Sequence, residues 1–98
     1  MRLRYTLPAL ADLATILDHI ADRSPQGARR VHARIRTLTD LLQRYPQAGA
    51  MTDDPTIRRI ATTPYPYLIL YETTDDEIII HAVRHGARDP IQDRRDPS

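Results

Sequence analysis

Arginine, histidine and tyrosine side chains gather around two hydrophobic runs in the C-terminal half of the chain. The set consists of Arg58, Arg59, Tyr67, Tyr71, Arg84, His85 and Arg88. Arginine neutralises phosphate and stabilises charge in phosphoryl transfer, histidine moves a proton near neutral pH, and tyrosine stacks on bases. Side chains of these types can cleave RNA without a metal ion. The alternative is that the arginines form surface ion pairs with Asp75, Asp76, Asp89 or Asp93.

Residue content excludes several other kinds of active site. The chain has no cysteine, its only serines are Ser24 and Ser98, and it contains neither a glycine-rich phosphate loop nor a His-Glu-x-x-His motif. His81 and His85 are four positions apart, which on a strand spans roughly 13 Å and is too far for one shared ion. We therefore expect no metal and no cofactor.

The two hydrophobic runs predict a β-hairpin. Residues 67–71 and 78–83 are rich in aromatic and β-branched side chains, and the polar residues 73–76 between them favour a turn. Arg58 and Arg59 precede this hairpin, whereas Arg84 and His85 follow it. Antiparallel pairing should therefore bring parts of the arginine and histidine set near Tyr67 or Tyr71.

The N-terminal part predicts a short strand followed by a helix. Residues 2–5 alternate polar and apolar side chains, Thr6 is a suitable N-cap, and Pro8 is tolerated in the first turn. Asp12 is placed to favour the positive end of the helix dipole. The expected apolar stripe comprises Leu10, Leu13, Leu17 and Ile20, with Ala14 and Ile16 flanking it.

A second helix is predicted from Ser24 and Pro25, a cap followed by a proline at the first helical position. Its apolar stripe comprises Ala28, Val31, Ile35, Leu38, Leu42 and Tyr45, and Pro46 and Gly49 end it. The other faces carry Arg29, Arg30, His32, Arg34 and Arg36. Such a run is typical of a solvated helix face, and a binding face is the alternative.

These elements define an α+β fold with the order β-α-α-β-β-β. After a loop over residues 46–56, a short strand at 57–61 and the hairpin form an antiparallel three-stranded meander, and the first strand joins one edge. The helical hairpin is expected to pack on one face of the sheet, with the strand around Ile78 to Ile80 in a central position. We expect one domain over residues 1–90 and a polar tail over residues 91–98.

Composition narrows the class of protein. The chain has 98 residues, 41% of them hydrophobic, and a net charge of +1, which is too close to neutral to indicate nucleic-acid binding by itself. All 14 basic residues are arginine, so every cation can grip phosphate or carboxylate at two points. No apolar stretch resembles a signal peptide or a membrane span, and we expect a cytoplasmic protein.

An ordered set of motifs along most of the chain resembles the RelE/ParE toxin superfamily, and its ParE branch most. The motifs are Tyr5-Thr6, Ala11-Asp12-Leu13 with Ile16, Ile20-Ala21, Arg30-Val31 with Ile35, Leu42 with Tyr45-Pro46 and Gly49, Arg58-Arg59, Tyr65-Pro66-Tyr67 with Ile69 and Tyr71, and Val83 with His85-Gly86-Ala87-Arg88-Asp89. The resemblance implies a helical hairpin against an antiparallel sheet. It also implies the toxin of a bacterial type II toxin-antitoxin module, a group that includes plasmid stabilisation proteins.

The resemblance further implies a partner and a target. The partner is an antitoxin encoded by the adjacent gene, whose acidic C-terminal segment would contact arginines such as Arg30 and Arg34. The ending from Arg84 to Asp89 is similar to ParE-like toxins, which bind and inhibit DNA gyrase rather than act as enzymes. The set from Arg58 to Arg88 would then serve toxicity or partner binding.

Two alternatives stay open beside gyrase inhibition. A RelE-like toxin would be a ribosome-dependent mRNA endoribonuclease, and its catalytic groups here would be Arg59, Tyr71 and His85. The chain lacks the lysines and the basic-plus-tyrosine ending of some of those nucleases. The second alternative is a non-toxic binding module of the same fold.

Overall fold

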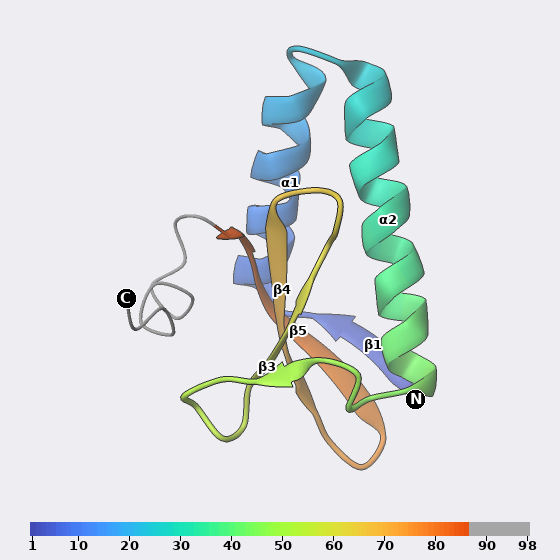
Figure 1. Ribbon diagram of the computed structural model, residues 1–98, viewed down its shortest axis with the longest axis vertical. Helices are drawn as coiled ribbons and strands as arrows, with labels where there is room; N and C mark the ends of the chain where they lie inside the picture. Colours follow the sequence, from blue (N-terminus) through green and yellow to red (C-terminus); the bar gives the residue numbers. More distant parts are fainter. Residues whose placement is uncertain (87–98) are drawn as a thin grey trace.

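The computed structural model describes residues 1–86 of the chain, and it confirms the α+β fold. The elements follow in the order β1 (Arg2–Tyr5), α1 (Leu7–Ala21), α2 (Pro25–Arg44), β2 (Ala50–Met51), β3 (Arg58–Ala61), β4 (Tyr67–Thr73) and β5 (Glu77–His85) (Figure 1). The strands form one sheet in the spatial order β1-β5-β4-β3-β2. A helical hairpin followed by an antiparallel meander is thus present as expected.

In the sheet, β5 lies between β1 and β4 over residues 77–80 and pairs with β4 alone beyond them. β5 pairs antiparallel with β4, and β1 joins the other side of β5 in parallel, so that Tyr5 lies opposite Ile80. The predicted central position of Ile78 to Ile80 is confirmed. Strand β2 was not predicted, because two residues are too short to display an alternating pattern.

Both predicted helix caps are confirmed. The Thr6 hydroxyl accepts the backbone N–H of Ala9 at 3.2 Å, and the Ser24 hydroxyl accepts that of Gly27 at 2.9 Å. The expected role of Asp12 at the helix dipole is wrong. Its carboxylate instead accepts the backbone N–H of Val83 at 3.1 Å, because that face of α1 lies against β5.

The buried stripe of α1 is rotated relative to the expected one. Ala9 is fully buried and Ile16 packs against the core, whereas Leu10 is 47% exposed. A small residue at position 9 lets the first turn approach β5 closely, which turns Leu10 outward. The inward face comprises Ala9, Leu13, Ile16, Leu17 and Ile20.

The stripe of α2 is confirmed except at its end. Val31, Ile35, Leu38 and Leu42 are buried, but Tyr45 is 62% exposed. The helix stops at Arg44, and the backbone of Tyr45 leaves the helical conformation with φ −130° and ψ 76°. The periodicity of 3.6 residues therefore no longer applies to Tyr45.

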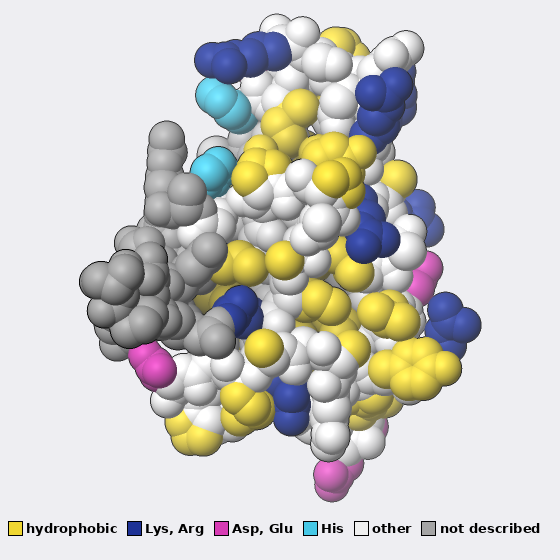
Figure 2. Space-filling model, viewed as in Figure 1, with side chains coloured by type: hydrophobic (Ala, Val, Ile, Leu, Met, Phe, Trp, Pro, Cys, Tyr) yellow, Lys and Arg dark blue, Asp and Glu magenta, His cyan; other side chains and the backbone are white. Residues whose placement is uncertain are grey.

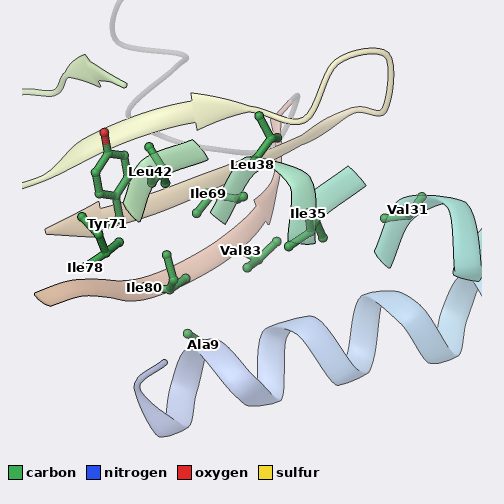
Figure 3. Packing of buried hydrophobic residues seen from close by; sticks show 10 residues of the cluster. All are labelled: Ala9, Val31, Ile35, Leu38, Leu42, Ile69, Tyr71, Ile78, Ile80 and Val83. Atoms are coloured by element: carbon green, nitrogen blue, oxygen red, sulfur yellow. The ribbon is translucent and has the colours of Figure 1, made fainter. Parts of the chain in front are cut away.

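The core lies between the helical hairpin and one face of the sheet (Figure 3). The sheet supplies Ile69, Tyr71, Ile78, Ile80 and Val83, and the helices supply Ala9, Val31, Ile35, Leu38 and Leu42. A β-bulge interrupts the β4–β5 ladder, since Leu70 pairs with Ala82 and Tyr71 with Ile80. The extra residue is His81, whose ring lies 2.9 Å from the carboxylate of Glu72.

Candidate functional site

The sheet separates the arginine, histidine and tyrosine set into two groups. Arg58 pairs with Tyr71 on β3 and β4, whereas His85 pairs with Tyr67 at the other end of β4. The distance along a strand from residue 67 to residue 71 is about 13 Å. Strand pairing therefore brings one basic residue to each tyrosine but does not bring the two groups together. Arg88 and the tail at residues 91–98 lie outside the described residues.

Tyr71 anchors the loop that follows α2. Its side chain is fully buried among the core residues (Figure 3). Its hydroxyl accepts the N–H of Gly49 at 2.9 Å and donates to the carbonyl oxygen of Pro46 at 2.8 Å. Burial raises the pKa of the Tyr71 phenol above its ordinary value of 10.0, although the Gly49 hydrogen bond and the Arg58 charge act in the opposite direction. The phenol therefore stays protonated at neutral pH and holds the loop.

Arg58 grips the same loop from the neighbouring strand. Its Nη1 atom donates to the carbonyl oxygen of Gly49 at 2.8 Å and lies 3.4 Å from that of Gln47. Arg58 and Tyr71 thus bind the two sides of one peptide segment. These contacts give both residues a structural role close to the exposed Tyr45.

A cavity of about 440 Å³ lies beside this anchored loop. Its lining comprises Arg44, Tyr45, Pro46, Gln47, Ala48, Thr73 and Thr74. Tyrosine and arginine are the side chains most often found at the centre of protein interfaces. The anchoring by Tyr71 therefore presents an exposed aromatic and a basic side chain on a fixed backbone.

Arg59 lies on the face of the sheet opposite the helices. It pairs with Leu70, one position out of phase with Tyr71, and successive side chains of a strand point to opposite faces. Its Nε atom is buried and has no hydrogen-bond partner among the described residues. Tyr71 and His85 belong to the helix-covered face, so Arg59 does not converge with them on one point.

The other group lies where β4 begins and β5 ends. The rings of Tyr67 and His85 meet edge to face, with centroids 5.7 Å apart and planes at 85°. The N–H of Gly86 donates to the carbonyl oxygen of Pro66 at 2.8 Å, which ties the two strand ends together. Arg84 pairs with Leu68, faces the other side and is exposed. This end therefore carries a basic side chain outside and an aromatic pair toward α1.

A second cavity, of about 390 Å³, opens beside the aromatic pair. Its lining comprises Thr15, Ile16, His19, Tyr67 and His85. Neither Thr15 nor His19 is among the predicted site residues, because the apolar stripe of α1 indicates only a helix that packs on the core. Their spacing of four places them on one side of a helix, which was the available signal.

The α2 residues assigned to antitoxin binding differ in their surroundings. The Nε atom of Arg34 donates to the carbonyl oxygen of Thr63 at 2.9 Å, which ties α2 to the β3–β4 loop, whereas Arg30 is exposed. Arginine side chains appear in dark blue along the α2 side of the molecule (Figure 2). The ion pairs within residues 1–86 are Arg2–Asp76, Arg4–Glu77 and His81–Glu72. None of these pairs neutralises an arginine of α2.

Two further properties concern the part of the chain that the structure describes. Within it, no three histidine, cysteine or acidic side chains are grouped to hold a metal ion. Neither helix within residues 1–86 has the length and apolar content that a membrane-spanning helix needs.

Comparison with known proteins defines the class of this fold and site. Residues 3–90 match the family described as the ParE toxin of the type II toxin-antitoxin system parDE, and the chain belongs to this family. It is 39% identical over 84 residues to the protein named Toxin RelE2 of Caulobacter vibrioides, covering 86% of this chain and 93% of that relative. It is also similar to a solved structure titled "Chromosomal ParDE TA system from P. aeruginosa", with a TM-score of 0.75, 26% identity and coverage of 87% of this chain and 95% of that one. The protein is thus a RelE/ParE-type toxin of a type II toxin-antitoxin system, and its family implies an antitoxin partner.

Proposed function

We propose that this toxin inhibits DNA gyrase by binding it and that it acts in the cytoplasm. The observation that carries the proposal is the separation of Arg59, Tyr71 and His85. Arg59 faces away from the helices, and the Tyr71 hydroxyl is engaged with Gly49 and Pro46. A ribonuclease needs its phosphate-binding and proton-transfer groups within hydrogen-bond reach of one scissile bond. A recognition surface around Arg84 and His85 has no such requirement.

The decisive experiment combines two assays of the purified protein. We expect inhibition of the supercoiling of relaxed plasmid by gyrase and no cleavage of mRNA on translating ribosomes. Normal supercoiling at toxin excess would overturn the gyrase proposal. Message cleavage that His85→Ala weakens would instead establish the nuclease alternative. A third assay expresses the chain without the neighbouring gene. Normal growth in that assay, together with no effect in the other two, would indicate a non-toxic binding module.

Residue-level tests use the exposed end of β5. Arg84→Glu reverses the charge of an exposed side chain and should weaken gyrase inhibition by about tenfold, since contacts to a charged group contribute ~1.5–3 kcal/mol. Arg2→Glu is the matched control, because its side chain is 74% exposed on the distant edge strand β1. Equal inhibition by the two variants would remove Arg84 from the recognition surface. Arg58, Arg59, Tyr67 and Arg88 stay proposals for toxicity or partner binding.

We further propose that the acidic segment of the antitoxin lies along α2 and contacts Arg30. This arginine is exposed, and none of the ion pairs among residues 1–86 includes it. Arg30→Glu should weaken antitoxin binding in isothermal titration, whereas Arg2→Glu should not. Arg34→Glu should weaken binding and also lower stability, because Arg34 donates to Thr63. Unchanged affinity in the Arg30 variant would place the antitoxin elsewhere.

A further inference from the structure

The outer side of α1 carries a row of apolar side chains. Leu7 is 81% exposed and Leu10 is 47% exposed, and both Ala11 and Ala14 are exposed as well. These four residues, named here the outer stripe, follow one another at the spacing i, i+3, i+4 and i+7 of a helix-packing face. Ala9 points from α1 toward the sheet (Figure 3), and the period of 3.6 residues turns the outer stripe away from it.

The exposed side of α2 shows a solvated helix face in the same protein. Its exposed residues include Gln26, Arg29, Arg30, His32, Arg36 and Asp40. A single exposed leucine needs no explanation, because apolar atoms make up much of any protein surface. A continuous apolar row along one side of a helix is different, since it indicates a surface that packs against another element.

The charges of α1 favour one occupant of the outer stripe. This helix contains no arginine, and it carries Asp12 and Asp18 with Asp22 at its C-cap. An acidic antitoxin segment would therefore be repelled here and attracted by the arginines of α2. A second copy of α1 in antiparallel orientation fits better, because Asp18 then lies beside the positive N-terminal end of the other helix.

The outer stripe is also complementary to itself about a twofold axis. In an antiparallel pair with Ala11 opposite Ala14 of the other copy, residue 18 lies opposite residue 7, and each contact occurs twice. The small side chains of Ala11 and Ala14 let the two helices approach closely, with Leu7 and Leu10 beside them. Residues 7 to 18 extend over about 16 Å of helix, so the contact covers three turns.

We propose that two copies of this chain associate through the outer stripes of α1, packed antiparallel about a twofold axis. A contact made by three turns of one helix from each copy is at the small end of protein interfaces. The dimer is therefore weak and its population depends on concentration. The proposal is independent of the cellular target of the toxin.

Sedimentation equilibrium of the full chain alone tests the association. We expect a monomer–dimer equilibrium, and Ala14→Arg should raise its Kd by about tenfold or more, because it brings an unpaired charge into the contact at two symmetric places. Ala33→Arg is the matched control, since Ala33 is an exposed alanine within α2. Both positions are exposed, so both variants should fold with unchanged circular dichroism. A monomer at the highest soluble concentration, or equal Kd values for the two variants, would overturn the proposal.

Cross-linking tests the antiparallel register. The chain has no cysteine, so introduced cysteines are the only thiols. Chains with Ala11→Cys and Ala14→Cys, one of them isotope-labelled, are mixed, oxidised in air and analysed by mass spectrometry. Mixed disulfides should exceed the share expected from random pairing, and Ala33→Cys gives the background rate. Mixed disulfides at the random share, or equal cross-linking at residue 33, would overturn the register.

Titration with the antitoxin separates the two possible occupants of the outer stripe. Ala14→Arg should leave antitoxin affinity unchanged in isothermal titration at concentrations where the toxin is a monomer. A variant that loses antitoxin binding but keeps the self-association of the unmodified chain would assign the outer stripe to the antitoxin and overturn the proposal.

Discussion

The carboxylate of Asp12 accepts the backbone N–H of Val83 at 3.1 Å, and this contact joins α1 to the outer half of β5. The pairing of β1 with β5 ends at Tyr5 and Ile80. Beyond that point, two side chains bond to β5 where a neighbouring strand would do so. They are Asp12 of α1 and the N-cap Thr6, whose Oγ1 atom lies 3.4 Å from the carbonyl oxygen of His81. The helix thereby positions the strand end that carries Arg84 and His85.

Replacing Asp12 should therefore loosen this end of β5. Asp12→Ala leaves the Val83 amide without its partner, which we expect to cost about 1–3 kcal/mol of unfolding free energy in urea. Asp12→Asn keeps an acceptor oxygen and should cost less. Amide hydrogen exchange should report faster exchange at Val83 in the alanine variant. Asp18→Ala, at an exposed position, is the control, and an equal effect of both alanine variants would contradict the positioning role.

Removing one oxygen atom from Tyr71 should destabilise the protein. Tyr71→Phe deprives the buried N–H of Gly49 and the carbonyl of Pro46 of their common partner, and we expect a loss of about 1–3 kcal/mol. Tyr45→Phe removes the same atom from a residue that is 62% exposed and should change stability by less than ~0.5 kcal/mol. Equal urea midpoints for the two variants would show that the phenol does not anchor the loop.

Gly49 has no room for a side chain. A methyl group there would lie 2.7 Å from the carbonyl oxygen of Arg59 and from the ring and hydroxyl of Tyr71. Gly49→Ala should therefore displace the loop and cost about 1–3 kcal/mol, measured by thermal or urea unfolding. Gly27→Ala is the comparison, since its nearest neighbour is the Ser24 hydroxyl at 3.1 Å rather than backbone or a ring, and alanine is favoured in helices. A Gly49 variant as stable as the Gly27 variant would contradict the close approach.

Alkaline pH should weaken the fold through the buried Tyr71 and the half-buried Tyr5. Burial raises the pKa of both Tyr5 and Tyr71 above the ordinary value of 10.0. The folded chain then holds these protons more tightly than the unfolded chain, so this part of the stability is complete below pH 10 and falls as pH rises toward the folded-state pKa. Urea unfolding between pH 9 and pH 11 measures the slope. The slope should diminish in the double variant Tyr5→Phe and Tyr71→Phe, and an unchanged slope would assign it to other groups.

Patterns among neighbouring residues predicted the helices and the main strands of this protein correctly. The Thr6 and Ser24 caps, the stripe from Val31 to Leu42 and the two strands of the hairpin follow from hydrogen-bonding preference and side-chain periodicity. These are properties of neighbouring residues. The errors lie where a distant partner competes with the local rule. Ala9 is buried instead of Leu10, because a small side chain lets the first turn of α1 lie close to β5. The Asp12 carboxylate accepts the N–H of Val83 instead of stabilising the N-terminus of its own helix.

The candidate site could be predicted from the sequence only in part. Sequence order indicated that arginine and histidine would lie beside the tyrosines, and pairing places Arg58 at Tyr71 and His85 at Tyr67. Which face each side chain occupies depends on the β-bulge at His81 and on strand register, and neither is encoded in residue type. The same limit explains why His19 was missed, since its position beside His85 arises only when α1 packs across the end of the sheet.

The sequence by itself determined the order of elements, most of the core and the membership of the toxin superfamily, because these rest on periodicity, capping and ordered motifs. Only the tertiary structure decided that Tyr71 and Arg58 hold a loop, that Arg59 faces away from them, and that two histidines from distant segments line one cavity. The physical reason is that a side chain's task depends on the groups it meets. Strand register and the packing of the helices on the sheet determine these contacts.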